Sequence, residues 1–265
     1  MAWLYQAITM GSPQPYKFPF CLWTLNIVRQ MLKQEKGIGL SKSAVCRLLQ
    51  HLGLSAQRPL YRSYKQDPRE LEQYLRQTFP ELKRLAQRLG AELYFADESA
   101  VRTDSHRGTT WGAIGQTPVV PDSGERFGMK LISAVSPRGD MRFAVIADRI
   151  NSDRFIEFLK KLCTDAGKPI IVIADNAPYH GSKKVRRFVQ QNQPLITLAH
   201  LPRYAPELNP DEQVWNHAKA RLAKLFIVSP ESLKRYLLNI LQSIQKRTDL
   251  ILSFFQLEST RYAAC

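Results

Sequence analysis

The sequence lacks paired cysteines, long apolar runs, internal repeats and low-complexity segments. Its four cysteines stand singly and form no Cys-x-x-Cys pair, which argues against a disulfide framework and against a zinc site. No run approaches the roughly 18 uninterrupted apolar residues of a membrane span. The first residues have neither the basic segment nor the long apolar run of a secretory signal. We therefore expect a cytoplasmic protein with no membrane partner.

Acidic residues are scarce at both ends of the chain. Residues 1–90 hold 14 Lys and Arg against 5 Asp and Glu, and residues 216–265 hold 8 against 3, whereas residues 91–215 hold 16 against 15. The 265-residue chain carries a net charge of +15, is 44% hydrophobic, and is therefore long and apolar enough to bury one or two cores. Two basic flanks around a near-neutral middle predict a polyanion partner, most commonly duplex nucleic acid; a basic surface that only aids solubility is the alternative.

Two short helices are predicted near the N-terminus. Prolines exclude a continuous helix over residues 11–20, a helical pattern starts at Trp23, and glycines break it before Ser41, which is a good N-cap for a second helix ending at Gly53. A helix pair with a glycine-containing turn is typical of a helix-turn-helix, although an ordinary helical hairpin has the same pattern. In the first case the polar face of the second helix would read DNA, through Lys42, Ser43, Arg47 and Gln50. Arg58 and Arg62, in a wing or linker behind it, would add contacts.

The middle of the chain alternates strands and helices. A helix over residues 68–89, interrupted near Pro80, leads to strands at 93–96, 129–135, 141–146, 170–174 and 195–198, with helices at 153–162 and 182–191. The predicted fold class is α/β: a ribonuclease-H-like mixed sheet with flanking helices, preceded by a small all-α helix-turn-helix domain. The predicted boundaries are a linker remnant (1–22), the helix-turn-helix domain (23–66), a connecting helix (67–90), the ribonuclease-H-like domain (91–228) and a helical extension (229–265).

Three acids stand at the ends of predicted elements. Asp97 and Asp175 close two strands, and Glu212 takes the third position of a helix whose N-cap would be Asn209. Singly, the aspartates are explained as turn residues and Glu212 as the return partner of a capping box. Together they predict a cation site, because two divalent ions roughly 3.5–4 Å apart serve phosphodiester cleavage and Mg²⁺ prefers oxygen ligands.

Three motifs around these acids resemble those of the mariner superfamily of DDE transposases, and more specifically its bacterial insertion-sequence branch. They are ADES at 96–99 followed by RGTTWG and GQTP, DNAPYH at 175–180, and LPRYAPELNPDEQVW at 201–215, with 36 residues between Asp175 and Glu212. The resemblance implies that Asp97, Asp175 and Glu212 form the catalytic triad and bind two Mg²⁺ ions, with Mn²⁺ as a substitute. Asp211 occupies the variable position before the glutamate and is therefore not part of the predicted triad.

The resemblance also implies a reaction. Double-stranded DNA would be cleaved at the ends of the element and the freed 3′-hydroxyl joined to target DNA, typically at TA, by a homodimer in a synaptic complex associated with the nucleoid. An inactive DNA-binding fragment or regulator, and a nuclease without strand transfer, are the alternatives. Only one helix-turn-helix unit is legible where relatives carry two, so a chain truncated at its N-terminus is expected.

Supporting roles are expected for residues within or near the motifs, namely Trp111, Asn176, His180, Asn209 and Trp215. His180 either has such a role or bonds only to its own loop backbone, and Trp215 would pack beneath Glu212. Lys183 and Lys184 would contact DNA phosphates or form a solvated helix face. Phe254 and Phe255 would dock on the core or on a partner subunit.

Overall fold

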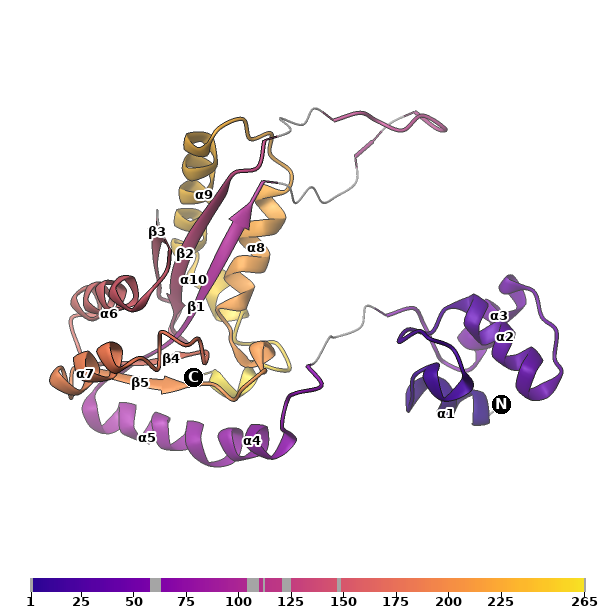
Figure 1. Ribbon diagram of the computed structural model, residues 1–265, viewed down its shortest axis with the longest axis horizontal. Helices are drawn as coiled ribbons and strands as arrows, with labels where there is room; N and C mark the ends of the chain where they lie inside the picture. The colour runs from indigo at the N-terminus through magenta and orange to yellow at the C-terminus, as the bar shows by residue number, and fades with distance from the viewer. Residues whose placement is uncertain are drawn as a thin grey trace. The chain divides into compact units, whose positions relative to one another are not determined.

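The computed structural model describes residues 2–57, 63–103, 110–111, 113–120, 125–146 and 149–264. The chain divides into two compact units, Met1–Tyr61 and Arg62–Cys265. Each unit is described by itself (Figure 1).

The first unit is helical. It contains α1 (Ala2–Thr9), a 3₁₀ turn (Gln14–Tyr16), α2 (Leu25–Lys36) and α3 (Lys42–His51). The Ser41 hydroxyl accepts a hydrogen bond from the Ala44 amide at 3.2 Å, so Ser41 caps α3 as its residue type predicts. Gly37 and Gly53 have φ of 68° and 76° and lie directly after the last turns of α2 and α3. The predicted helix pair and its turn are confirmed.

Residues 1–22 are not a linker remnant, and this prediction was wrong. Leu4 and Ala7 of α1 and Phe18 are buried, and they pack in one cluster with Val28 and Met31 of α2. The apolar residues were present in the sequence, but three prolines at 13, 15 and 19 obscured a segment that packs without being a continuous helix. The N-terminal segment is therefore part of the core of the first unit.

The second unit is built on a five-stranded mixed sheet with the strand order β3-β2-β1-β4-β5. Its strands are β1 (Glu92–Arg102), β2 (Gly128–Val135), β3 (Met141–Ile146), β4 (Ile170–Ala174) and β5 (Ile196–His200). β2 pairs antiparallel with β1 and β3, whereas β4 pairs parallel with β1 and β5. β4 is buried at every position, as its continuous apolar sequence predicts. The element order and the mixed sheet agree with the predicted ribonuclease-H-like fold.

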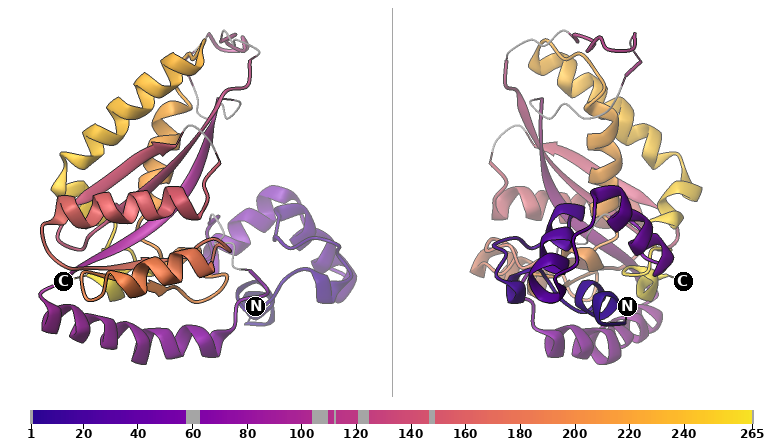
Figure 2. Two further views of the ribbon diagram at one scale, coloured as in Figure 1. Left: turned by 60° about the vertical axis from the view of Figure 1, so that its left-hand side comes forward. Right: turned by 90° about the vertical axis from the view of Figure 1, so that its right-hand side faces the viewer.

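Helices cover both faces of this sheet (Figure 2). α6 (Ser152–Ala166) and α7 (Lys183–Gln191) pack on one face. The other face is covered by α5 (Phe79–Leu89), α8 (Glu212–Leu222), α9 (Pro230–Gln245) and α10 (Thr248–Ser253). α4 (Pro68–Gln73) runs into α5 through a π-helical segment (Tyr74–Thr78), which is the interruption predicted near Pro80. Phe254 and Phe255 are buried in the core beside α10, so these two side chains dock within the chain.

β1 is longer than predicted, and Asp97 lies in its middle instead of at its end. Parallel pairing with β4 stops at Phe95 opposite Ile173, but antiparallel pairing with β2 continues until Arg102 lies opposite Gly128. The strand end that was expected at Asp97 is therefore the point where pairing with β4 stops while pairing with β2 continues. Asp97 still lies just beyond the carboxyl end of the parallel strands, where open sheets bind ligands.

Candidate active site

The three predicted catalytic acids line one cavity of about 520 Å³. Asp97 reaches it from β1, Asp175 from the residue directly after β4, and Glu212 from the first residue of α8. The sheet places Asp97 and Asp175 on neighbouring strands, and α8 runs beside β1 (Figure 1). The rest of the wall comes from residues 201–206 and from Asn176, Ala177 and Asn209. Three carboxyl groups far apart in sequence are thus brought to a common space.

The carboxylate of Asp175 is held by its own loop. Its Oδ1 accepts hydrogen bonds from the Ala177 amide at 2.9 Å and from His180 Nδ1 at 3.0 Å. Burial opposes ionisation of Asp175, but these hydrogen bonds and the positive fields of His180 and His200 outweigh burial and lower its pKa below the ordinary value. Asp175 is therefore ionised at neutral pH.

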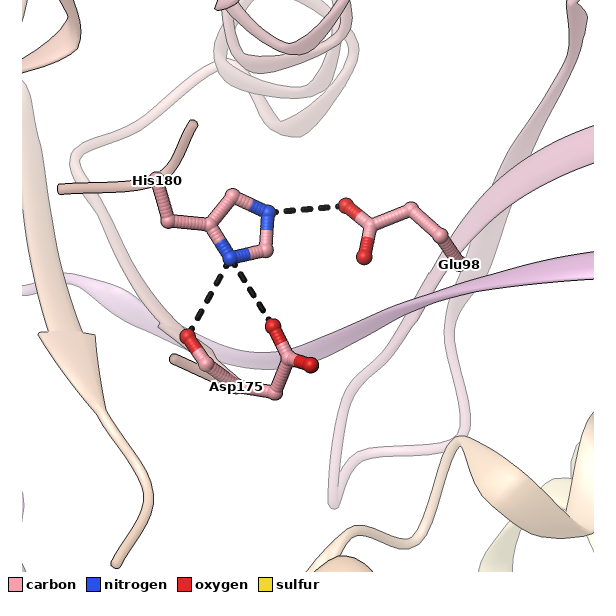
Figure 3. Close-up of side chains that lie close together, drawn as sticks. All are labelled: Glu98, Asp175 and His180. Atoms are coloured by element: carbon pink, nitrogen blue, oxygen red, sulfur yellow. Dashed lines mark hydrogen bonds and ion pairs between the residues drawn. The ribbon is translucent and has the colours of Figure 1, made fainter. Parts of the chain in front are cut away.

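His180 connects Asp175 to the strand that carries Asp97 (Figure 3). It is fully buried, and its Nε2 lies 2.8 Å from Glu98 Oε1, while its Nδ1 also lies 3.1 Å from the Asp175 carbonyl oxygen. Burial disfavours the imidazolium, but the hydrogen bonds to Asp175 and Glu98 raise the pKa of His180 to about 9. His180 bonds to the backbone of its own loop, which was one of the two expectations. It also bonds to Glu98 on β1, so its contacts are not confined to that loop. Sequence reasoning did not predict a role for Glu98. Strand alternation places its side chain on the opposite face of β1 from the Asp97 side chain.

The remaining two acids resist ionisation. Burial, followed by the negative field of Glu212, raises the pKa of Asp97 to about 8. Burial also raises the pKa of Glu212, an effect that Lys219 opposes and Asp175 reinforces. Like charges in a partly buried cavity repel, so a bound cation would stabilise the ionised forms of all three carboxyl groups.

The start of α8 differs from the prediction. The helix begins at Glu212 instead of Pro210, because the preceding bonds, from the Glu212 amide to the Asn209 carbonyl and from the Gln213 amide to the Pro210 carbonyl, form a tighter 3₁₀-type turn. Asn209 still ties down this turn. Its Oδ1 accepts from the Asp211 amide at 3.1 Å, and its Nδ2 donates to the Ala96 carbonyl at 3.0 Å. Asn209 therefore fixes Glu212 next to the residue that precedes Asp97.

Asp211 points away from the cavity, into the protein. It is fully buried and its Oδ2 accepts a hydrogen bond from the Ser133 hydroxyl at 2.5 Å. Burial, followed by the field of Asp97, raises its pKa well above the ordinary value. This geometry agrees with leaving Asp211 out of the predicted triad.

The rim of the cavity includes Asn176, which was expected as a supporting residue, and Arg203 and Tyr204, which sequence reasoning missed. Asn176 Nδ2 donates to the Leu201 carbonyl at 2.7 Å and so attaches the Asp175 loop to the segment after β5. In that segment Arg203 and Tyr204 are exposed, and Tyr204 has a φ of 58°, a conformation rare for a residue with a side chain. Both residues belong to the motif at 201–215, in which only the acids drew attention. No spacing in the sequence marked Arg203 as a site residue.

Other predicted residues lie elsewhere. Trp215 is buried in the core beneath the start of α8, as expected, whereas the Trp111 side chain is 99% exposed. Lys183 and Lys184 are exposed on α7, where Lys184 pairs with Asp153. Arg58 and Arg62 lie outside the described residues. The four predicted DNA-reading side chains are exposed on α3, namely Lys42, Ser43, Arg47 and Gln50.

The cavity has the donor set of a divalent-metal site. Carboxylate oxygens are the ligands that Mg²⁺ and Mn²⁺ prefer, and three carboxyl groups line one space in which burial, followed by acidic neighbours, raises the pKa of Asp97. These residues therefore fit a hard divalent cation.

Comparison with known families identifies the domain that carries this cavity. Residues 92–234, more than half of the chain, match the DDE superfamily endonuclease family. The chain belongs to this family. A DDE endonuclease domain implies the use of a divalent metal, and the sheet and acids described above lie within the matched residues. Residues 19–78 match the winged helix-turn-helix family, which supports binding of duplex DNA.

Solved structures of Mos1 mariner transposase share the fold of this chain. The paired-end complex with Mg matches at a TM-score of 0.62 and 19% identity, over 95% of this chain and 77% of that chain. The paired-end complex with Mn matches at 0.60 and 17% identity, over 89% and 78%. The strand transfer complex matches at 0.57 and 17% identity, over 91% and 76%. No curated protein sequence matches the chain. Among the described residues, no helix combines the length and apolar character needed to cross a membrane.

Proposed function

We propose that this protein is a transposase that cleaves DNA at the ends of its element and joins the freed 3′ ends to target DNA. The observation that carries the proposal is the single cavity lined by Asp97, Asp175 and Glu212 in a DDE endonuclease domain that follows a winged helix-turn-helix. The Mos1 complexes, solved with paired transposon ends and after strand transfer, support it by their common fold.

The three acids would hold two Mg²⁺ ions, with Mn²⁺ as a substitute. When bound, such ions activate the attacking water or hydroxyl and stabilise the leaving oxygen. Asp175, ionised and held by His180, offers a fixed negative charge, and Asn209 holds Glu212 near β1. Exposed Arg203 on the rim offers a cation for the phosphate that enters the cavity.

The first unit would bind the element's ends through exposed side chains of α3. The side chains that would contact the DNA are Lys42, Ser43, Arg47 and Gln50. In the DDE domain, Lys183 and Lys184 would contact DNA phosphates. A homodimer that pairs two DNA ends, and a cytoplasmic protein associated with the nucleoid when bound to DNA, complete the proposal.

The test uses labelled duplex DNA that carries the element's ends, with Mg²⁺ and with Mn²⁺. We expect metal-dependent nicking at the ends followed by joined products. Asp97→Asn and Glu212→Gln should bind the DNA with unchanged affinity and cut it at least about 10³-fold more slowly, since each removes a ligand of the proposed metal site.

The matched control is Asp211→Asn, which changes the acid next to Glu212. Its carboxyl group is buried against Ser133 and does not line the cavity, so the amide should replace it with cleavage within a few-fold of the unsubstituted protein. Cleavage without joined products would indicate a nuclease that lacks strand transfer. Salt-sensitive DNA binding with no nicking in either metal would indicate a DNA-binding protein without the proposed activity.

A further inference from the structure

A buried histidine joins the loop after β4, which bears Asp175, to β1, which bears Asp97 (Figure 3). His180 Nδ1 lies 3.0 Å from Asp175 Oδ1, and Nε2 lies 2.8 Å from Glu98 Oε1. Both ring nitrogens thus face carboxylate oxygens. Glu98 directly follows Asp97 on β1, so the contact ties the loop after β4 to the neighbouring strand.

This contact determines which oxygen of Asp175 is available to a ligand. Asp175 follows the last residue of β4, and its side chain is 52% exposed, so packing alone does not fix its rotamer. Oδ1 is occupied by His180 and by the Ala177 amide. In the part of the chain that the structure describes, Oδ2 has no hydrogen-bond partner, and Asp175 lines the cavity with Asp97. The hydrogen bonds on Oδ1 therefore leave Oδ2 as the free ligand atom.

The histidine is itself held rigidly. Its ring contacts Phe155 of α6 in a tilted arrangement at a centroid distance of 4.2 Å and Tyr179 in an edge-to-face arrangement at 4.6 Å, and it has no exposed surface. The Glu98 side chain is 10% exposed and lies on the α6 face of β1, opposite the Asp97 side chain. His180 thus fixes the orientation of Asp175 relative to β1, the strand that also positions Asp97.

We propose that Glu98 and His180 are positioning residues that orient Asp175 Oδ2 toward the divalent cation of the DDE site. The inference rests on the metal site of the proposed function. Histidine, aspartate and glutamate atoms within 4.8 Å of one another also have the composition of a transition-metal site, but here they already bond to one another. Hydrogen bonds of this kind fix the geometry of metal ligands in other proteins.

The experiment measures Mn²⁺ binding to the full chain without DNA, by isothermal titration calorimetry. Glu98→Ala removes the acceptor for His180 and should weaken Mn²⁺ binding about tenfold. Glu98→Gln keeps an acceptor oxygen and should stay within about twofold, because the amide can still hold the ring. Glu157→Ala, which removes an exposed glutamate of α6, is the matched control and should leave binding unchanged. His180→Asn should weaken binding as Glu98→Ala does.

Cleavage assays with the same variants separate positioning from general damage. The Mn²⁺ concentration for half-maximal cleavage should rise in Glu98→Ala, while the rate at saturating Mn²⁺ returns close to that of the unsubstituted protein. If Glu98→Ala does not fold, Glu98→Asp, which withdraws the carboxylate by one methylene, carries the same expectation.

Two results would overturn the inference. The first is a folded Glu98→Ala or Glu98→Asp variant with lower thermal stability but unchanged Mn²⁺ affinity, since a purely structural role predicts that pattern. The second is tight Zn²⁺ binding that both Glu98→Ala and His180→Asn abolish while Mn²⁺ binding persists. By contrast, unchanged Mn²⁺ binding in Asp97→Asn and Glu212→Gln would show that the proposed metal site itself is misplaced.

Discussion

Asp97 carries a large ionisation cost because its carboxyl group is buried and lies in the field of Glu212 and other acids. A pKa of about 8 means that Asp97 holds a proton at neutral pH in the absence of metal. A cation that binds in the cavity must displace this proton. Metal binding and proton release are thus coupled at a single residue.

Metal affinity should therefore depend on pH. Below about pH 8, Mn²⁺ affinity should fall up to about tenfold for each unit of pH, and binding should release close to one proton at pH 7. Calorimetry in two buffers of different ionisation enthalpy measures the proton count. An affinity that stays flat from pH 6 to pH 8 would contradict the assignment of Asp97 as a metal ligand.

The same carboxyl group should shape the stability of the metal-free protein. Its pKa is higher in the folded chain than the ordinary value of 3.8, so the folded state binds more protons between about pH 4 and pH 8. Stability should fall as pH rises through that window, by at most about 1.4 kcal/mol per pH unit from this group, and level off above it. Asp97→Asn should remove this slope in urea unfolding measured from pH 5 to pH 8, whereas an unchanged slope would place the proton elsewhere.

At the scale of elements, the β2–β3 hairpin turns at Gly139, where the chain meets α10. Gly139 has a φ of 89°, and a Cβ added there would lie 2.4 Å from Thr248 Cγ2. Gly139→Ala combines a strained backbone with a steric clash and should destabilise the protein by about 2–4 kcal/mol. Gly167→Ala, at a helix end with a φ of 63° and an open surrounding, should cost only about 1–2 kcal/mol. Equal losses in urea unfolding would contradict the clash.

The turn that precedes α8 depends on the buried amide of Asn209. Asn209→Ala leaves the Ala96 carbonyl and the Asp211 amide without partners and should cost about 2–4 kcal/mol. Asn216→Ala, on the exposed side of the same helix, should cost under about 0.5 kcal/mol. Thermal unfolding with and without Mn²⁺ checks both, and the metal-induced shift in Tm should shrink in Asn209→Ala alone because Glu212 is then less well placed.

Sequence reasoning recovered elements whose signals are local. Ser41 and the glycines at 37 and 53 specified the helix pair, and the alternation from β1 to α8 specified the mixed sheet. It failed where the outcome depends on partners distant in sequence. Asp97 became a mid-strand residue because β2 continues past the end of β4, and Glu98 acquired a role only through His180, 82 positions later. No local pattern encodes such contacts.

At the scale of the whole molecule, two separate cores support two separable tasks. The core around Met31 and Val45 belongs to the first unit, and the clusters on both faces of the sheet belong to the second. DNA binding and metal binding should therefore respond to different substitutions.

Lys42→Ala combined with Arg47→Ala tests this separation. Loss of two phosphate-attracting charges should weaken duplex binding and lower the dependence of log affinity on log salt by up to about two units. Mn²⁺ binding in the absence of DNA should be unchanged. Fluorescence anisotropy over a salt series and calorimetry measure the two properties, and a weakened Mn²⁺ site in this variant would show that the units are energetically linked.

The antiparallel pairing of β1 with β2 beyond Asp97 has a consequence for the connection that follows β1. Backbone hydrogen bonds with β2 hold the strand on both sides of Asp97, out to Arg102 and Gly128. The acid therefore does not depend on the connection over residues 103–127 for its position. A change in the length of that connection should therefore leave Asp97 in place in the sheet, even though it alters the RGTTWG and GQTP motifs that the connection contains.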